Sequence, residues 1–121
     1  MTLQDCYQAL GGDYDDVMGR LRKESMVEKF VFRFLEDQSF SVLCSAIQEK
    51  NREEAFRAAH TIKGVCQNLG FTKLLESSSD LTEALRTQWE ESVPSLFERV
   101  TADYNQAAAA ITVYRNQTEN M

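Results

Sequence analysis

Residues 58–71 read AAHTIKGVCQNLGF and hold His60, the only histidine in the 121-residue chain. At about 100° per residue, a helix through this stretch has an apolar side and a polar side. The apolar residues recur at helical spacing and comprise Ala55, Ala58, Ile62, Val65, Cys66 and Leu69. Such a stripe predicts a helix packed against a core. His60 falls roughly opposite its centre, so the imidazole should face solvent.

Three further residues share the predicted His60 face, at i+3, i+4 and i+7: Lys63, Gly64 and Gln67. They place a cation, a patch of bare backbone and an amide beside the imidazole. A glycine inside a helix costs about 1 kcal/mol relative to alanine. Gly64 therefore indicates that another backbone approaches closely here. Core packing explains this face poorly, and we expect it to receive a partner.

The bulk composition is that of one ordinary globular domain. A chain of this length can bury very roughly two thirds of its unfolded surface, so it can fold alone. The net charge of −6 opposes nucleic-acid binding, which needs a basic face. No apolar run approaches the roughly 18 residues of a membrane span. Residues 1–5 lack the basic and apolar regions of a signal peptide. We therefore expect a cytoplasmic protein without membrane contact.

The three cysteines, Cys6, Cys44 and Cys66, are odd in number and far apart in the sequence. Each one sits in an apolar helical pattern. This placement predicts buried free thiols in a reducing compartment rather than a redox or metal-binding role.

The pattern of the whole chain predicts an all-α protein. One proline, five glycines and almost no alternating apolar pattern leave little room for strands. The expected helices are 3–10, 14–21, 26–36, 39–49, 52–69, 73–89 and 93–115. Short connections favour antiparallel neighbours. We therefore expect a single domain over residues 1–121. Its last four helices form an antiparallel up-down-up-down four-helix bundle, and helix 26–36 packs at or across them. Short N-terminal helices in residues 1–24 cap one end, and the polar tail 115–121 frays.

Local signals suggest where these helices begin and end. The expected N-terminal caps are Ser25 in a capping box with Glu28, Ser39, Asn51, Thr72 and Ser92. Pro94 suits the first turn of the last helix. Gly11 and Gly70 are expected to end helices in the left-handed conformation.

The segment from His60 to Gly64, followed by residues 68–71, resembles the signature of the histidine-containing phosphotransfer (Hpt) domain family. Domains of this family carry a phosphoryl group on one histidine between the receiver domains of two-component phosphorelays. The length and helical pattern of the remaining chain agree with that resemblance. It implies a histidine phosphocarrier that acts in signal transduction and exchanges the group with an aspartate of a receiver domain.

The resemblance assigns roles to the residues around the histidine. His60 is the phosphoacceptor, because an exposed imidazole is mostly neutral near pH 7 and can attack through a ring nitrogen. Lys63 stabilises charge on the phosphoryl oxygens, unless it is only a solvated surface lysine. Gln67 either donates a hydrogen bond to phosphate or is a plain surface amide. Phe56 and Phe71 lie on the His60 side and predict a contact surface, although Phe71 can also fold into the core.

In this family a polar residue, often glutamine or glutamate, commonly sits twenty-two positions after the histidine and holds the imidazole. Here Thr82 occupies that position, and its side chain is shorter. Three outcomes stay open. Glu83 can substitute, Arg86 can substitute, or the imidazole is held less firmly.

The resemblance also implies the partners. A response-regulator receiver domain brings the aspartate and the Mg²⁺, and a sensor histidine kinase or hybrid kinase supplies the phosphoryl group. This chain itself is then a monomer without metal or cofactor. We expect a phosphotransfer intermediate rather than an enzyme, without kinase activity of its own, because the sequence lacks the Gly-rich ATP loop of a kinase. The start at Met1 and the full domain length favour a free-standing carrier.

Two other classes of function compete with this interpretation. The first is a helical module that binds a receiver domain without phosphotransfer, and the set of His60, Lys63 and Gly64 argues against it. The second is an enzyme. The sequence lacks the metal ligands that a metal-dependent hydrolase needs, since it has one histidine and no Glu-x-x-His motif. Cysteine–histidine catalysis needs a thiol that faces His60, whereas Cys66 falls on the apolar side of the helix.

Overall fold

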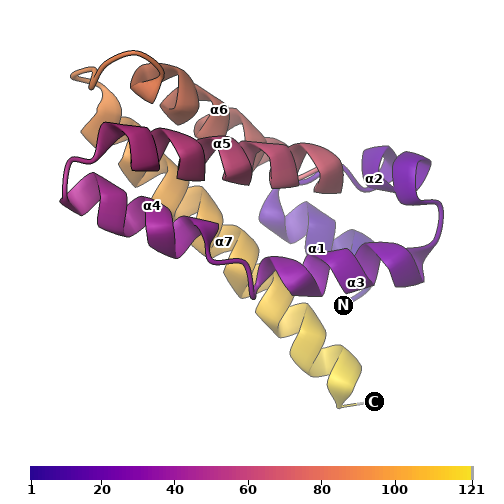
Figure 1. Ribbon diagram of the computed structural model, residues 1–121. Helices are drawn as coiled ribbons and strands as arrows, with labels where there is room; N and C mark the ends of the chain where they lie inside the picture. Colours follow the sequence, from indigo (N-terminus) through magenta and orange to yellow (C-terminus); the bar gives the residue numbers. More distant parts are fainter. Residues whose placement is uncertain (121) are drawn as a thin grey trace.

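The structure is a computed structural model that describes residues 1–120. Over that range it contains seven α-helices and no strand (Figure 1). Their bounds are α1 Leu3–Leu10, α2 Tyr14–Leu21, α3 Glu24–Phe34, α4 Ser39–Gln48, α5 Arg52–Leu69, α6 Thr72–Leu85 and α7 Val93–Glu119. The all-α prediction is confirmed. Among these helices, none combines the length and the apolar character needed to cross a membrane.

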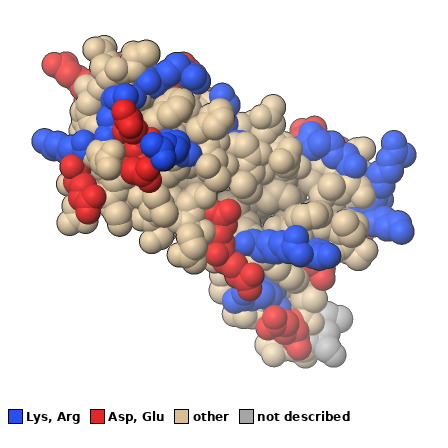
Figure 2. Space-filling model, viewed as in Figure 1, with Lys and Arg blue, Asp and Glu red and all other residues tan. Residues whose placement is uncertain are grey.

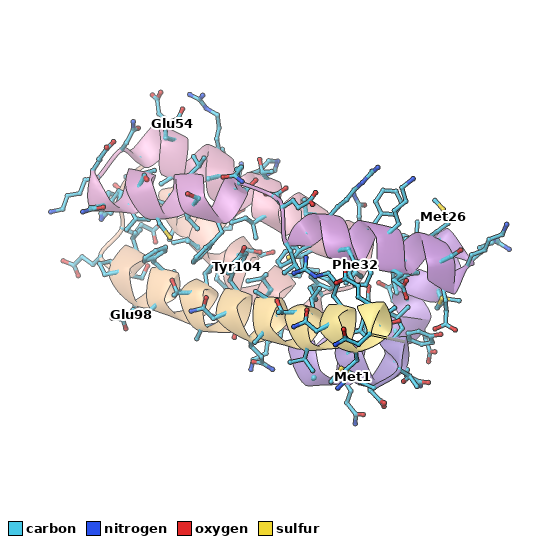
Figure 3. The ribbon with its side chains drawn as sticks, turned by 90° about the horizontal axis from the view of Figure 1, so that it is seen from below. Met1, Met26, Phe32, Glu54, Glu98 and Tyr104 are labelled. Carbon is cyan, nitrogen blue, oxygen red and sulfur yellow. The ribbon has the colours of Figure 1, made fainter. Side chains whose placement is uncertain are left out.

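The bundle consists of α4, α5, α6 and α7, joined by short connections as predicted. Helix α5 packs between α4 and α6, and α6 packs against α7. Aromatic side chains close the remaining side, where Phe40 of α4 stacks on Tyr104 of α7 with ring centroids 4.0 Å apart. Figure 3 shows Tyr104 in the layer between α7 and the helices that face it. The up-down-up-down arrangement therefore has a common core.

The three N-terminal helices extend this core beyond the bundle. Helix α1 packs against α7, and α3 leads into α4 along the same side of the molecule (Figure 1). The buried rings of Tyr7 and Phe34 both contact Phe71, with centroids 5.6 Å and 5.1 Å away and their planes steeply inclined. Edge-to-face packing of this kind is favourable for aromatic rings. It ties α1 and α3 to the point where α5 turns into α6.

Several predicted helix ends are confirmed. The Asn51 side chain accepts a hydrogen bond from the Glu54 backbone N–H at 3.2 Å, which caps α5. Gly11 and Gly70 end α1 and α5 in the left-handed region, with φ of 77° and 71°. Ser92 occupies the N-cap position of α7 and Pro94 lies in its first turn, as predicted, but the Ser92 side chain makes no capping hydrogen bond.

Three predicted N-caps are wrong. Helix α3 begins at Glu24, so Ser25 lies inside the first turn and cannot cap it. Ser39 is the first residue of α4, and its own N–H donates to the Asp37 carboxylate at 2.7 Å. Thr72 is likewise the first residue of α6, after Phe71 at the N-cap position. In each case the residue expected at the N-cap lies inside the first turn of the helix.

The ends of α6 and α7 also differ from the predictions. Helix α6 stops at Leu85, where the Arg52 side chain donates to the carbonyl groups of Leu85 and Arg86, both at 2.9 Å. Those bonds satisfy carbonyls that the last turn leaves unpaired. Helix α7 continues to Glu119 instead of fraying from residue 115. The Tyr114 hydroxyl donates to Glu28 at 2.6 Å and holds this end against α3. The final residue, 121, lies outside the described range.

The cysteines are free thiols, as predicted. Cys6 and Cys66 are fully buried in the core, and Cys44 is half-buried on α4. Burial raises the pKa of the Cys66 thiol to about 12 and that of the Cys6 thiol to about 11. Both are therefore protonated and poorly nucleophilic near neutral pH.

Candidate functional site

His60 lies on the solvent face of α5, as the periodicity predicted. The opposite side of α5 is buried, apart from the half-buried Val65; the buried residues are Ala55, Ala58, Ala59, Ile62, Cys66 and Leu69. Neighbouring helices cover both flanks of α5 and leave one strip open. On this strip His60, Gly64 and Gln67 are exposed, and Lys63 is half-buried. The structure thus brings the four residues of the predicted face together on one surface.

A row of side chains runs from His60 across to α6. The Phe56 ring lies nearly parallel to the imidazole, with centroids 5.9 Å apart and an interplanar angle of 15°. The Arg86 guanidinium lies 5.2 Å from the centre of the Phe56 ring. Glu83 accepts two hydrogen bonds from Arg86, at 2.7 Å and 3.2 Å. The predicted contact residues Phe56 and Arg86 therefore belong to one assembly with His60.

The charges on this row reinforce one another. The hydrogen bond from Arg86 lowers the pKa of Glu83, and the positive charge of Lys63 lowers it further. Conversely, the hydrogen bond to Glu83 raises the pKa of Arg86. Lys63 is close enough to influence Glu83 and lies one turn from His60. A cation therefore stands beside the histidine.

Gly64 leaves a gap in the side-chain surface next to His60. A Cβ atom built at this position would meet no heavy atom within 4 Å. Packing inside the domain therefore does not require a glycine here. The backbone of α5 is open to solvent at this point, which is the geometry that a close partner needs.

The prediction for Phe71 is wrong in its placement on the contact surface. This side chain is only 1% exposed and packs in the core against Tyr7 and Phe34. Gly70 adopts the left-handed conformation and reverses the chain, so Phe71 no longer follows the spacing of α5. Of the two alternatives raised by the sequence, the core position is the one observed.

Thr82 does not lie on the contact surface either. It is fully buried, and its hydroxyl donates to the Ser78 carbonyl of its own helix at 2.6 Å. A short β-branched hydroxyl in a helix commonly bonds backward in this way. Thr82 therefore cannot hold the imidazole as the residue at this position does in the family. Glu83 and Arg86 are exposed and both belong to the row that reaches His60: Arg86 contacts Phe56, and Glu83 is connected to the row through Arg86.

Sequence patterns did not predict that α1 and α2 stabilise the end of the His60 helix. The Arg20 guanidinium donates to the carbonyls of Gln67 and Asn68 at 2.9 Å and 3.1 Å. The Tyr7 hydroxyl donates to the carbonyl of Leu69 at 2.7 Å. The last carbonyls of a helix lack partners within it, so these bonds stabilise the end of α5. The only local hint was the i,i+4 pair of Arg20 with Asp16.

A cavity of about 370 Å³ opens beside this end of α5. Residues of α2, α3 and α5 line it, together with Asp37: Arg20, Leu21, Phe30, Arg33, Phe34, Asp37, Val65, Asn68 and Leu69. Figure 2 shows Lys and Arg atoms over α2 and α3, charges of both signs near the start of α5, and a broad uncharged area between them. The exposed face of α5 thus adjoins a mainly apolar hollow whose charged lining residues are Arg20, Arg33 and Asp37.

The family of the chain follows from a comparison of its sequence with known proteins. Residues 26–110 match the Hpt domain. This range begins in α3, ends in α7 and includes all of α4, α5 and α6, with His60 and its face. Searches of curated proteins and of solved structures found no match to the chain. Because the matched range covers well over half of the sequence and contains the site described above, this protein belongs to the Hpt domain family.

Proposed function

We propose that this protein is a histidine phosphocarrier, which accepts a phosphoryl group on His60 and exchanges it with an aspartate of a response-regulator receiver domain. The observation that supports this most directly is the position of His60, exposed on α5 inside the matched range 26–110. Hpt domains are phosphotransfer intermediates of phosphorelays and generally are not kinases themselves. The phosphoryl group then comes from a partner.

The proposed step is a direct transfer between two proteins. A ring nitrogen of His60 attacks the phosphorus of the receiver's aspartyl phosphate, and the N–P bond forms as the acyl O–P bond breaks. The aspartate leaves as a carboxylate, and the other ring nitrogen keeps its proton. The reverse reaction returns the group to an aspartate. Catalysis in such a step is mainly in-line positioning and charge stabilisation.

The neighbouring side chains suit that step. Lys63 offsets negative charge on the phosphoryl oxygens, and Gln67 donates a hydrogen bond to them. Gly64 lets the loops of the receiver approach the α5 backbone. The receiver supplies the aspartate and the Mg²⁺, while a sensor histidine kinase or hybrid kinase feeds the relay. We further propose that the carrier acts as a monomer.

The proposal is tested by incubating the chain with a phosphorylated receiver domain and Mg²⁺. We expect label that is lost in acid, as a phosphohistidine requires, and that mass spectrometry assigns to His60. Stable complex formation without any label on this chain would instead identify a receiver-binding module that lacks phosphotransfer. A pull-down with receiver domains from the same genome selects the partner to use.

A further inference from the structure

We infer that Phe56, fixed in place by Arg86, positions the His60 imidazole for phosphoryl transfer. The inference rests on the proposed function of His60. It assigns to a stack of side chains the orienting role that a hydrogen bond from the next helix would otherwise have. Phe56 and Arg86 are positioning residues in this account, and neither contacts the reacting atoms.

The first step of the argument is that α6 offers no hydrogen bond from the expected position. Thr82 is fully buried, and its hydroxyl is engaged by the Ser78 carbonyl. The side chain that stacks on the imidazole is Phe56. The centroids of the two rings are 5.9 Å apart, and the angle between their planes is 15°. Contact through a ring face restricts the tilt of the imidazole, whereas an exposed side chain without such contact samples several rotamers.

The second step is the geometry of α5. Side chains on a helix tilt toward its N-terminus, so a residue leans over the one four positions earlier. His60 therefore leans over Phe56. The stack follows from the helix itself and does not depend on a loop or on an N-terminal segment.

The third step is that α6 fixes the Phe56 ring. Phe56 is half-buried, and the Arg86 guanidinium lies 5.2 Å from its centre. Glu83 holds that guanidinium with two hydrogen bonds. A planar guanidinium suits the face of an aromatic ring, and its contact with the ring is attractive. The order Glu83, Arg86, Phe56, His60 thus connects the orientation of the imidazole to the rigid α5–α6 pair.

Two variants test the stack, and two matched variants control for its loss. Phe56→Leu keeps apolar bulk but removes the ring, and Arg86→Gln removes the cation. Phe97→Leu is the matched control for the first, because Phe97 is also half-buried and stacks on a neighbouring ring, Phe40, with centroids 6.4 Å apart and an interplanar angle of 17°. Arg99→Gln is the control for the second. Arg99 is an ion-paired arginine on α7 whose side chain is 40% exposed, against 46% for Arg86.

One readout is independent of phosphotransfer. His60 is the only histidine, so the two carbon-bound ring protons of the imidazole give unambiguous NMR signals. The ring current of Phe56 acts on these protons. We expect Phe56→Leu to shift them clearly, Arg86→Gln to shift them less, and both controls to leave them in place. Phe56→Tyr keeps the ring and should restore the wild-type positions.

The second readout is transfer from a phosphorylated receiver in single-turnover experiments. We expect Phe56→Leu to lower the maximal rate about ten-fold, because a misaligned nucleophile reacts slowly. The receiver concentration at half-saturation should change little, and Phe56→Tyr should recover the rate. Wild-type rates in both controls complete the expected result.

Several outcomes would overturn the inference. Unchanged His60 signals in Phe56→Leu would show that the rings do not stack in solution. If Phe56→Leu changed the receiver concentration at half-saturation but not the maximal transfer rate, Phe56 would be a docking residue only. If Phe56→Leu lost its helical CD signal, the test would rest on Arg86→Gln. That variant would then have to change both the His60 NMR signals and the maximal transfer rate. If wild-type protein takes no phosphate on His60, the proposed function fails, and the inference fails with it whatever the NMR shows.

Discussion

His60 is accessible because the side chains on the opposite face of α5 are buried. Ala58 and Ile62 turn into the core, which leaves the imidazole on the open strip. Replacing the imidazole would remove its stack on Phe56, but the side chain is exposed and is not part of the core. The residue is therefore free to change chemically while the fold stays the same.

A first prediction follows at this position. His60→Gln should abolish phosphoryl acceptance, because no other histidine is present. Its thermal midpoint and helical CD signal should stay near the wild-type values, since an exposed substitution usually changes stability by less than about 0.5 kcal/mol. Phosphorylation of the variant by the receiver is measured with the same acid-lability assay. Label that persists on His60→Gln would place the phosphoacceptor elsewhere.

Gly64 separates the demands of stability and of function. Gly64→Ala should stabilise the protein by about 0.5–1 kcal/mol, because the helix gains propensity and the new Cβ meets nothing. Gly64→Gln should also stay folded, yet slow transfer from a receiver domain sharply. Transfer from a small phosphodonor such as acetyl phosphate should slow much less. Urea unfolding and the two transfer rates check these expectations.

Gly19 provides the control for this experiment. It lies inside α2, and a Cβ there would likewise meet nothing within 4 Å. Gly19→Gln should therefore leave both transfer rates unchanged. Equal rates for Gly64→Gln and wild type with the receiver would mean that access is not the reason for this glycine.

At the scale of elements, the helices with strong apolar periodicity were predictable, and α5 is the clearest case. Its stripe, its Asn51 cap and its Gly70 terminus are all encoded within a few residues. The start of α3 was not predictable in this way, because the helix begins at Glu24 with Lys23 at the N-cap, whereas the local pattern favoured Ser25 as the cap. Phe71 was misplaced because helical spacing was extended past the turn at Gly70. Sequence periodicity applies only while the backbone stays helical.

Other features depended on contacts between distant parts of the chain. Arg52 sets the end of α6 from α5, and Tyr114 holds the end of α7 through Glu28. The bonds from Arg20 to the end of α5 span more than forty residues of sequence. Local patterns carry no information about such partners. The site was therefore predictable at His60 and its helix neighbours, whereas the support from α1, α2 and α6 was not.

The support at the end of α5 leads to a prediction for Arg20. Arg20→Gln should lower the free energy of unfolding by about 1 kcal/mol, because two helix-end carbonyls lose their donor. Amide hydrogen exchange should accelerate in the last turn of α5, and much less around His60. Arg57→Gln is the control, since Arg57 pairs with Glu54 but caps no helix. Equal exchange in wild type and Arg20→Gln would show that solvent replaces the guanidinium at no cost.

For the molecule as a whole, the N-terminal helices are part of the core although the family match begins at residue 26. Helices α1 and α2, which precede the matched range, contribute five buried side chains: Leu3, Cys6, Tyr7, Leu10 and Val17. Helix α1 packs on α7, and its Tyr7 hydroxyl reaches the end of α5. This arrangement predicts that α1 and the bundle unfold together.

The buried thiols report on this cooperativity. Cys6 lies on α1 and Cys66 on α5, and burial raises both thiol pKa values, to about 11 and about 12. The thiolate is the reactive form of cysteine. At a pH below the pKa of the thiol, each unit by which that pKa is raised lowers the thiolate fraction about ten-fold. Cys44 is only half-buried, so it should react first with iodoacetamide at pH 8.

The rates for Cys6 and Cys66 then distinguish two ways of opening. If α1 and the bundle open as one unit, both thiols become reactive only through global unfolding, and their alkylation rates should coincide across low urea concentrations. Mass spectrometry of the digested protein measures each site, and alkylation in high urea gives the unprotected rates. Faster alkylation of Cys6 than of Cys66 would mean that α1 detaches while α5 stays packed. The carbonyls at the end of α5 would then lose the Tyr7 hydroxyl without the protein unfolding.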